Sequence, residues 1–156
     1  MALLPNVFVP EDAEAMEFKT LPAGWYLAEL VKSELKDTNA KDGKYLALKF
    51  RIVEDAEIDG VEVKSEGRFV FTNLNIVNKN ETAVKLARFD LKKICAAVGH
   101  EGELEDTVDL HNIELQIKLS VKPATSEWPE KNEIKGYRYA DGVEIEFDDA
   151  GQLIPR

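Results

Sequence analysis

Basic and aromatic side chains that could act together are concentrated in residues 36–51, 64–68 and 122–138. Single-stranded nucleic acid is bound by cations that follow its phosphates and by flat rings on which its bases stack. The candidates for these contacts are Lys36, Lys41, Lys44, Tyr45, Lys49, Arg51, Lys64, Arg68, Lys122, Trp128, Lys131, Lys135 and Tyr137. They predict a surface that binds a single strand whatever its base sequence. Taken singly, each lysine is also typical of a solvated strand residue.

Trp128 is the strongest single candidate among the aromatic residues. It lies in a polar loop between prolines and lysines, where packing in a core makes little demand on it. We expect Phe69 and Phe71 in the core, although their alternation with Arg68 would also suit a stacking platform. Trp25 is expected in the core or across its end.

Catalytic and metal-binding signatures are scarce. The nine glycines form no GxxxxGK phosphate loop, and His100, His111 and the single Cys95 do not make up an ordinary zinc site. The acidic stretches 54–59 and 101–106 have no EF-hand spacing and are typical of solvated loops. We therefore predict a protein that is not an enzyme, with no catalytic residue, no metal and no cofactor. The alternative is a metal-dependent nuclease that uses these loop carboxylates.

The negative charge of the chain is concentrated at its two ends. Of the net charge of −10, residues 1–20 carry −3 and residues 141–156 carry −4, which leaves −3 for residues 21–140. The middle of the chain therefore disfavours a polyanionic partner less than the total suggests. The single cysteine and the lack of an apolar run of roughly 20 residues favour an intracellular protein that crosses no membrane.

Hydrophobic alternation and one change of period predict the elements that position these side chains. Alternating residues predict strands at 25–35, 45–53, 61–73, 111–122 and 132–139. A period of three to four residues predicts one helix after the third strand, with Asn80 as its N-cap and Gly99 as its C-cap.

The order of three strands, one helix and two strands favours a mainly β fold. We predict a five-stranded OB-fold-like barrel with one α-helix between strands 3 and 4, and a two-layer α+β sandwich is the alternative. In an OB-fold the face of strands 2 and 3, with two of the loops, binds oligonucleotides, and residues 36–51 and 122–135 occupy those places.

Three parts of the chain are expected. Residues 1–20 form an N-terminal arm that packs through Val7, Phe8 and Val9, and residues 21–140 form the OB-fold domain. Residues 141–156 form an acidic C-terminal segment with two equal interpretations. It is either a flexible tail that competes with DNA and recruits proteins, or a last strand that packs on the body through Val143, Ile145 and Phe147.

Several short motifs resemble those of a known family. They are Leu21-Pro22-Ala23-Gly24-Trp25-Tyr26, Asp42-Gly43-Lys44-Tyr45-Leu46, Leu74-Asn75, the helix residues Arg88, Leu91, Ile94, Cys95, Ala97, Val98 and Gly99, and Asn132-Glu133-Ile134-Lys135-Gly136-Tyr137. The chain thereby resembles, over residues 20–139, small tailed-phage proteins long catalogued as a domain of unknown function, whose genes lie among replication and recombination genes. The resemblance implies a phage single-stranded-DNA-binding protein of OB type that acts in DNA replication or recombination, in the cytoplasm of the bacterial host.

The expected partners are single-stranded DNA and, through the acidic C-terminal segment, replication or recombination proteins. The alternative is an adaptor of the replication machinery whose acidic surfaces dock a helicase, recombinase or nuclease without direct DNA contact. The sequence leaves open the oligomeric state, with a homodimer among the options, and the choice between DNA and RNA.

Overall fold

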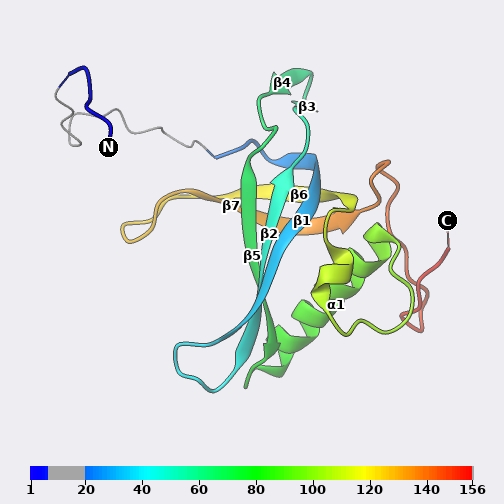
Figure 1. Ribbon diagram of the computed structural model, residues 1–156. Helices are drawn as coiled ribbons and strands as arrows, with labels where there is room; N and C mark the ends of the chain where they lie inside the picture. Colours follow the sequence, from blue (N-terminus) through cyan, green and yellow to red (C-terminus); the bar gives the residue numbers. More distant parts are fainter. Residues whose placement is uncertain (7–19, 156) are drawn as a thin grey trace.

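A computed structural model describes residues 1–6 and 20–155 of the chain (Figure 1). Its elements are β1 (Gly24–Asp37), β2 (Lys44–Ile52), β3 (Ala56–Ile58), β4 (Val61–Val63), β5 (Phe69–Val77), α1 (Glu81–Val98), the 3-10 helix η2 (Thr107–Leu110), β6 (Glu114–Lys122) and β7 (Lys131–Arg138). The predicted mainly β fold with one long helix is therefore confirmed. No helix in this part of the chain has the length and apolar character needed to cross a membrane.

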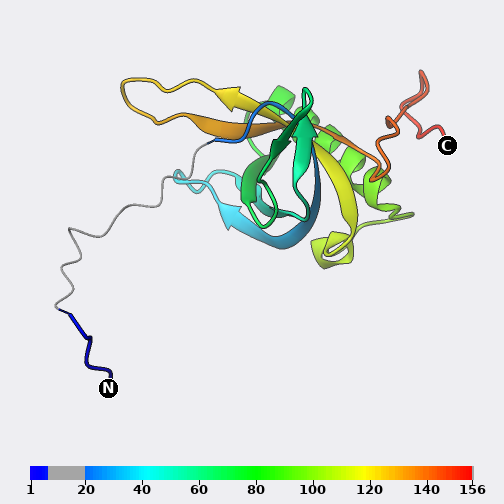
Figure 2. The ribbon, with the colours of Figure 1, turned by 90° about the horizontal axis from the view of Figure 1, so that it is seen from above.

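Five strands form one antiparallel sheet in the order β5-β2-β1-β6-β7, while β3 and β4 form a separate hairpin. β5 and β7 are the two edges of the main sheet, and no hydrogen-bonded ladder joins them within the described residues. The sheet is therefore not closed, and the prediction of a barrel is wrong in this respect. The sheet curves, and α1 packs against β5, β6 and β7 (Figures 1 and 2).

The predicted third strand, residues 61–73, is two elements rather than one. β4 ends at Val63, and the chain turns at Gly67, which has a φ of 84° that glycine tolerates well, before β5 begins. The turn is held by Asp55, whose Oδ1 accepts hydrogen bonds from the backbone N–H groups of Ser65 and Glu66 at 3.0 Å each. The α-helix therefore follows the fifth strand of the chain, not the third.

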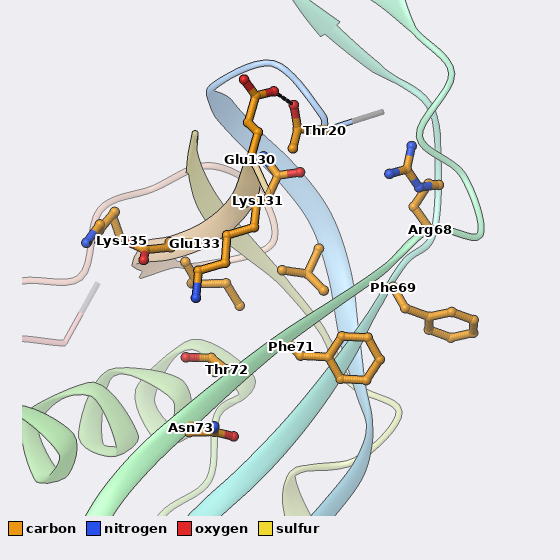
Figure 3. Close-up of a pocket in the computed structure, with 13 residues that line it drawn as sticks. Thr20, Arg68, Phe69, Phe71, Thr72, Asn73, Glu130, Lys131, Glu133 and Lys135 are labelled. Atoms are coloured by element: carbon orange, nitrogen blue, oxygen red, sulfur yellow. Dashed lines mark hydrogen bonds and ion pairs between the residues drawn. The ribbon is translucent and has the colours of Figure 1, made fainter. Parts of the chain in front are cut away.

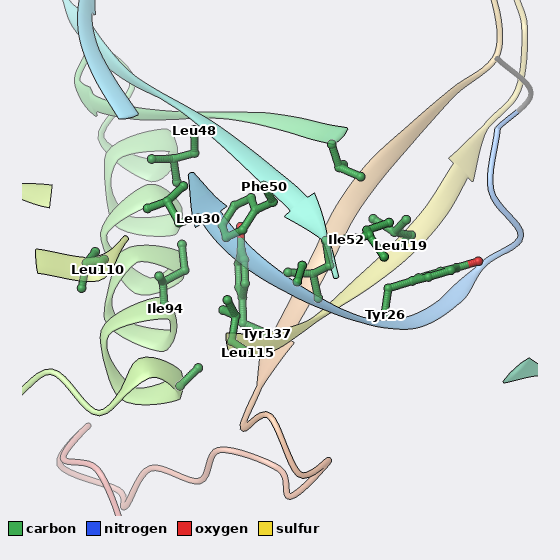
Figure 4. Packing of buried hydrophobic residues seen from close by; sticks show 14 of the residues in the cluster. Tyr26, Leu30, Leu48, Phe50, Ile52, Ile94, Leu110, Leu115, Leu119 and Tyr137 are labelled. Atoms are coloured by element: carbon green, nitrogen blue, oxygen red, sulfur yellow. The ribbon is translucent and has the colours of Figure 1, made fainter. Parts of the chain in front are cut away.

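The ends of α1 agree with the prediction. The Oδ1 of Asn80 accepts hydrogen bonds from the N–H groups of Thr82 and Ala83, and Gly99 adopts a left-handed φ of 77° after the last turn. The helix packs against β5, β6 and β7. Ile94, on the buried side of the helix, faces the strands (Figure 4).

The core lies between α1 and the inward face of the sheet (Figure 4). Its largest fully buried side chains are Tyr26, Leu30, Leu48, Phe50, Ile52, Ile94, Leu110, Leu115, Ile117 and Leu119. Tyr137 also belongs here: it is 5% exposed and its ring lies 6.0 Å from that of Phe50. Burial raises the pKa of Tyr137, mainly through desolvation of the hydroxyl and to a smaller extent through the charge of the nearby Asp90. Tyr137 is therefore a packing residue, and its ring is not available for stacking on a base.

The C-terminal segment packs on the helix. A β-bridge joins Phe147 to Leu153, and the ring of Phe147 lies 5.3 Å from that of Phe89 on α1. The Nζ of Lys92 donates a hydrogen bond to the carbonyl oxygen of Gly151 and lies 4.9 Å from the Phe147 ring. The described part of this segment, residues 141–155, forms no strand, and Val143 is 45% exposed, so the prediction of a last strand is wrong. Packing on the body is supported at Phe147.

The N-terminal arm meets the sheet at Leu21. The N–H of Leu21 donates to Oδ1 of Asn132 at 2.8 Å, and Nδ2 of Asn132 donates to the carbonyl oxygen of Leu21 at 2.8 Å. This pair of bonds ties the start of β1 to the start of β7. The predicted packing of Val7, Phe8 and Val9 concerns residues outside the described part of the chain.

Candidate nucleic-acid interface

β5 presents two phenylalanine rings on the outward face of the sheet. Phe69 is 47% exposed and Phe71 is 65% exposed, whereas Val70 between them is buried. The expectation that these rings lie in the core is therefore wrong. Alternation places neighbouring side chains of a strand on opposite faces, but it does not say which face is turned to the core. In β5 the smaller Val70 and Leu74 face the core.

Lys49 of β2 lies beside both rings. β2 and β5 pair so that Lys49 stands opposite Phe71, and the Lys49 ammonium is 4.1 Å from the centroid of Phe69 and 5.9 Å from that of Phe71. Such a contact at an exposed site contributes about 0.5–1 kcal/mol. A cation and two flat rings are thus held together on one exposed patch.

A second lysine faces Lys49 from the other neighbouring strand. After a bulge between Leu30 and Lys32, β1 resumes its pairing with Lys32 directly opposite Lys49. Like charges in this position destabilise a sheet. Glu34 offsets part of the repulsion, because its carboxylate lies 3.0 Å from Lys32 Nζ and 3.5 Å from Lys36 Nζ. The hydrogen bond from Lys32, and then the charges of both lysines, lower the pKa of Glu34.

These side chains surround a shallow depression on the outward face. It has a volume of about 160 Å³, and its lining includes Lys32, Lys36, Lys49 and Phe71 together with the carboxylate residue Glu34. We call the outward face formed by Lys32, Lys36, Lys49, Phe69 and Phe71 the ring-and-lysine face. Tyr45 and Arg51 point to the same side of β2, with Arg51 3.7 Å from Glu29. Anionic and flat ligands both find complementary groups there.

A larger groove separates the two open edges of the sheet. It has a volume of about 680 Å³ and is lined by Arg68, by β5 from Phe69 to Asn73 and by β7 from Lys131 to Lys135 (Figure 3). Figure 3 shows Phe69 and Phe71 on the side of β5 away from Lys131 and Glu133. The groove and the ring-and-lysine face therefore share β5 as a common border.

Charges of both signs line this groove. Glu133 lies 2.9 Å from Lys135 Nζ and 3.8 Å from Lys122 Nζ, and the hydrogen bond from Lys135 is the main cause that lowers the pKa of Glu133. The Oγ1 of Thr20 donates a hydrogen bond to Glu130 at one end. The predicted cations Lys122, Lys131 and Lys135 therefore belong to a mixed surface rather than to a purely positive one.

The remaining predicted residues lie on projecting loops. Lys41 and Lys44 are on the β1–β2 loop or at its end, where Lys44 pairs with Asp37 at 3.5 Å, and Lys64 pairs with Glu62 at 3.4 Å beside the β3–β4 hairpin. The β1–β2 and β6–β7 loops extend to the same side of the sheet in both views (Figures 1 and 2). Exposed ion pairs contribute only about 0–1 kcal/mol, so the pairs of Lys44 and Lys64 are broken at little cost.

Sequence reasoning missed three members of this face, which are Lys32, Phe69 and Phe71. The charges of Lys32, Glu34 and Lys36 alternate at the end of β1, which is a signal of a solvent-facing row that could have been found. The exposure of Phe69 and Phe71 has no such signal, because both rings would suit a core equally well. Trp128, by contrast, lies at a loop tip away from this face and is 70% exposed.

The comparisons with known proteins place the chain in a family. Residues 8–151 match the model of a family described as a protein of unknown function, DUF669. The chain belongs to the DUF669 family. The matched range contains β5, the ring-and-lysine face, α1 and most of the C-terminal segment, so the candidate interface lies within the family's own region. A comparison with curated proteins finds no match.

Among the described residues, no group of three or more His, Cys, Asp or Glu could hold a metal ion.

Proposed function

We propose that this DUF669 protein binds single-stranded DNA without sequence preference, through the ring-and-lysine face. The observation that carries the proposal is the position of the Lys49 ammonium, 4.1 Å from the Phe69 ring and next to the exposed Phe71, with Lys32 opposite. A polyanion with flat bases satisfies all of these groups at once, because its phosphates neutralise the neighbouring lysine charges while its bases stack on the rings.

The contacts on this face select for a single strand rather than for a sequence. Bases in a duplex are already stacked on each other, whereas an unpaired base can lie on Phe69 or Phe71. A ring offers its π face to any base, and lysine is a point charge that contacts phosphate without reading base edges. Lys49 reaches a phosphate by turning its flexible stem away from the rings as a base covers them.

The strand order supports a relation to OB-folds. Three strands of the main sheet precede α1 in the chain, namely β1, β2 and β5, and they pair in the order β5-β2-β1. The two strands after α1 extend the sheet from β1, in the order β6-β7. We propose that this is an OB-type sheet opened between its third and last strands, which makes the outward face of β2 and β5 the usual oligonucleotide surface. Together with the resemblance to tailed-phage proteins, this supports a role in phage replication or recombination.

Titration of a labelled oligo-dT with the full chain tests the proposal. Fluorescence anisotropy at several salt concentrations should give an affinity that falls with salt, with a log-log slope of about −0.7 for each phosphate neutralised. A blunt duplex of the same length is the matched ligand and should bind at least tenfold more weakly. Absence of oligo-dT binding at low salt, or equal binding of the duplex, would overturn the proposal.

A further inference from the structure

The β6–β7 hairpin presents an exposed tryptophan in an ordered turn. Trp128 is held at the tip by Thr125, whose N–H donates to the Trp128 carbonyl oxygen at 2.8 Å and whose Oγ1 accepts from the Trp128 N–H at 3.0 Å. Its neighbour Glu127 is also exposed, and residues 123–130 contain two acids and no base. This acidic tip projects from the body in both views and disfavours contact with phosphate (Figures 1 and 2).

A pocket with the opposite character lies where β5 ends and α1 begins. It has a volume of about 420 Å³, and Ile76, Val77 and Val84 supply its apolar lining. Val77 is 50% exposed although it is apolar. Lys85 and Arg88 stand on the same face of α1, and with Asn78 and Glu81 they complete the lining. Within residues 1–6 and 20–155, neither Lys85 nor Arg88 forms an ion pair.

The two features complement each other in shape and charge. An exposed indole next to an acid matches an apolar pocket flanked by the cations Lys85 and Arg88. Tryptophan and arginine are among the residues that most often dominate protein interfaces. The tip and the pocket lie on different parts of the molecule, so a chain does not fill its own pocket (Figure 1). We infer that the Trp128 tip of one copy docks into the Lys85–Arg88 pocket of a second copy.

The contact joins two different surfaces, so it repeats. Each copy that uses its tip leaves its own pocket open, and a contact of this heterologous kind builds chains or rings rather than a symmetric pair. One hairpin tip makes a small interface, which is expected to be weak and concentration-dependent. The inference does not depend on the proposed function. If both hold, neighbouring copies on one DNA strand bind cooperatively.

Mixing two variants tests the contact without nucleic acid. Trp128→Ala removes the tip and Lys85→Glu/Arg88→Glu reverses the pocket, and both changes lie on exposed positions. In sedimentation velocity, the wild-type chain should grow beyond a dimer as its concentration rises, and each variant alone should associate at least tenfold more weakly. A one-to-one mixture should form heterodimers and nothing larger, because only one intact tip and one intact pocket meet.

Matched controls separate this contact from general effects of charge and hydrophobicity. Val61→Ala removes an exposed apolar side chain from the β3–β4 hairpin, and Lys64→Glu/Lys118→Glu changes the net charge as much as the pocket variant does. Both should associate like the wild type. A wild-type chain that stays monomeric up to roughly 1 mM, at the weak end of specific association, would overturn the inference. Growth that stops at a dimer, or a variant mixture that stays monomeric, would do the same.

Discussion

The role of the Phe71 ring is the sharpest consequence of the structure. Phe71 is 65% exposed and is flanked by the Lys49 ammonium at 5.9 Å, so replacing it removes little buried area. Phe71→Leu keeps an apolar side chain but no π face, whereas Phe71→Tyr keeps the ring. Loss of one stacking residue costs about 1–3 kcal/mol, which corresponds to an affinity for oligo-dT about 5- to 150-fold weaker for Phe71→Leu.

Two measurements on the same samples decide this prediction. Fluorescence anisotropy with labelled oligo-dT should show the loss for Phe71→Leu and an affinity within about threefold of wild type for Phe71→Tyr, well short of the loss of a stacking residue. Urea unfolding should show both variants within about 0.5 kcal/mol of wild type, as for other surface substitutions. If Phe71→Leu binds as tightly as Phe71→Tyr, the ring is not a stacking platform. Equal losses in both variants would also refute the reasoning.

Three further predictions concern charge, capping and burial. Lys49→Met should weaken oligo-dT binding and reduce the magnitude of the salt slope by about 0.7, whereas Phe71→Leu should leave the slope unchanged; equal slopes for Lys49→Met and wild type would contradict a phosphate contact. Asn80→Ala should lower the free energy of unfolding by about 0.5–2 kcal/mol in urea titrations with oligo-dT affinity retained, because it removes the N-cap of α1; unchanged stability would count against the cap. Burial raises the pKa of the Tyr137 hydroxyl above its ordinary 10.0. Above pH 10 the unfolded chain therefore releases this proton before the folded chain does, and the contribution of Tyr137 to stability, which is fully present below pH 10, is lost as the pH rises. The free energy of unfolding should therefore fall more steeply above pH 10 in wild type than in Tyr137→Phe, and parallel pH profiles would refute this.

Local patterns in the sequence determined most of the elements. Alternation located β1, β2, β6 and β7 to within a few residues, because a half-buried strand requires it. Asn80 and Gly99 marked the ends of α1 because unpaired backbone groups at a helix terminus need a side-chain cap or a left-handed residue. Positions of loops, and hence of their lysines, followed from the same signals.

The third dimension decided how these elements are used. The sequence predicted one strand over residues 61–73 with a bend or bulge near Gly67, but the turn there separates β4, which pairs with β3, from β5, which pairs with β2. The bulge in β1 shifts the phase of the pattern and places Lys32 opposite Lys49, which no local count reveals. Tyr137 looked like a surface ring in a polar strand, yet its neighbours across the fold bury it.

The candidate interface shows the same division. The sequence alone determined that basic and aromatic residues of distant segments would share a small β domain. Tertiary packing decided which of them meet, because the core takes the side chains that fill it best and leaves the others outside. The space under β5 suits Val70 and Leu74, so Phe69 and Phe71 remain on the surface beside Lys49.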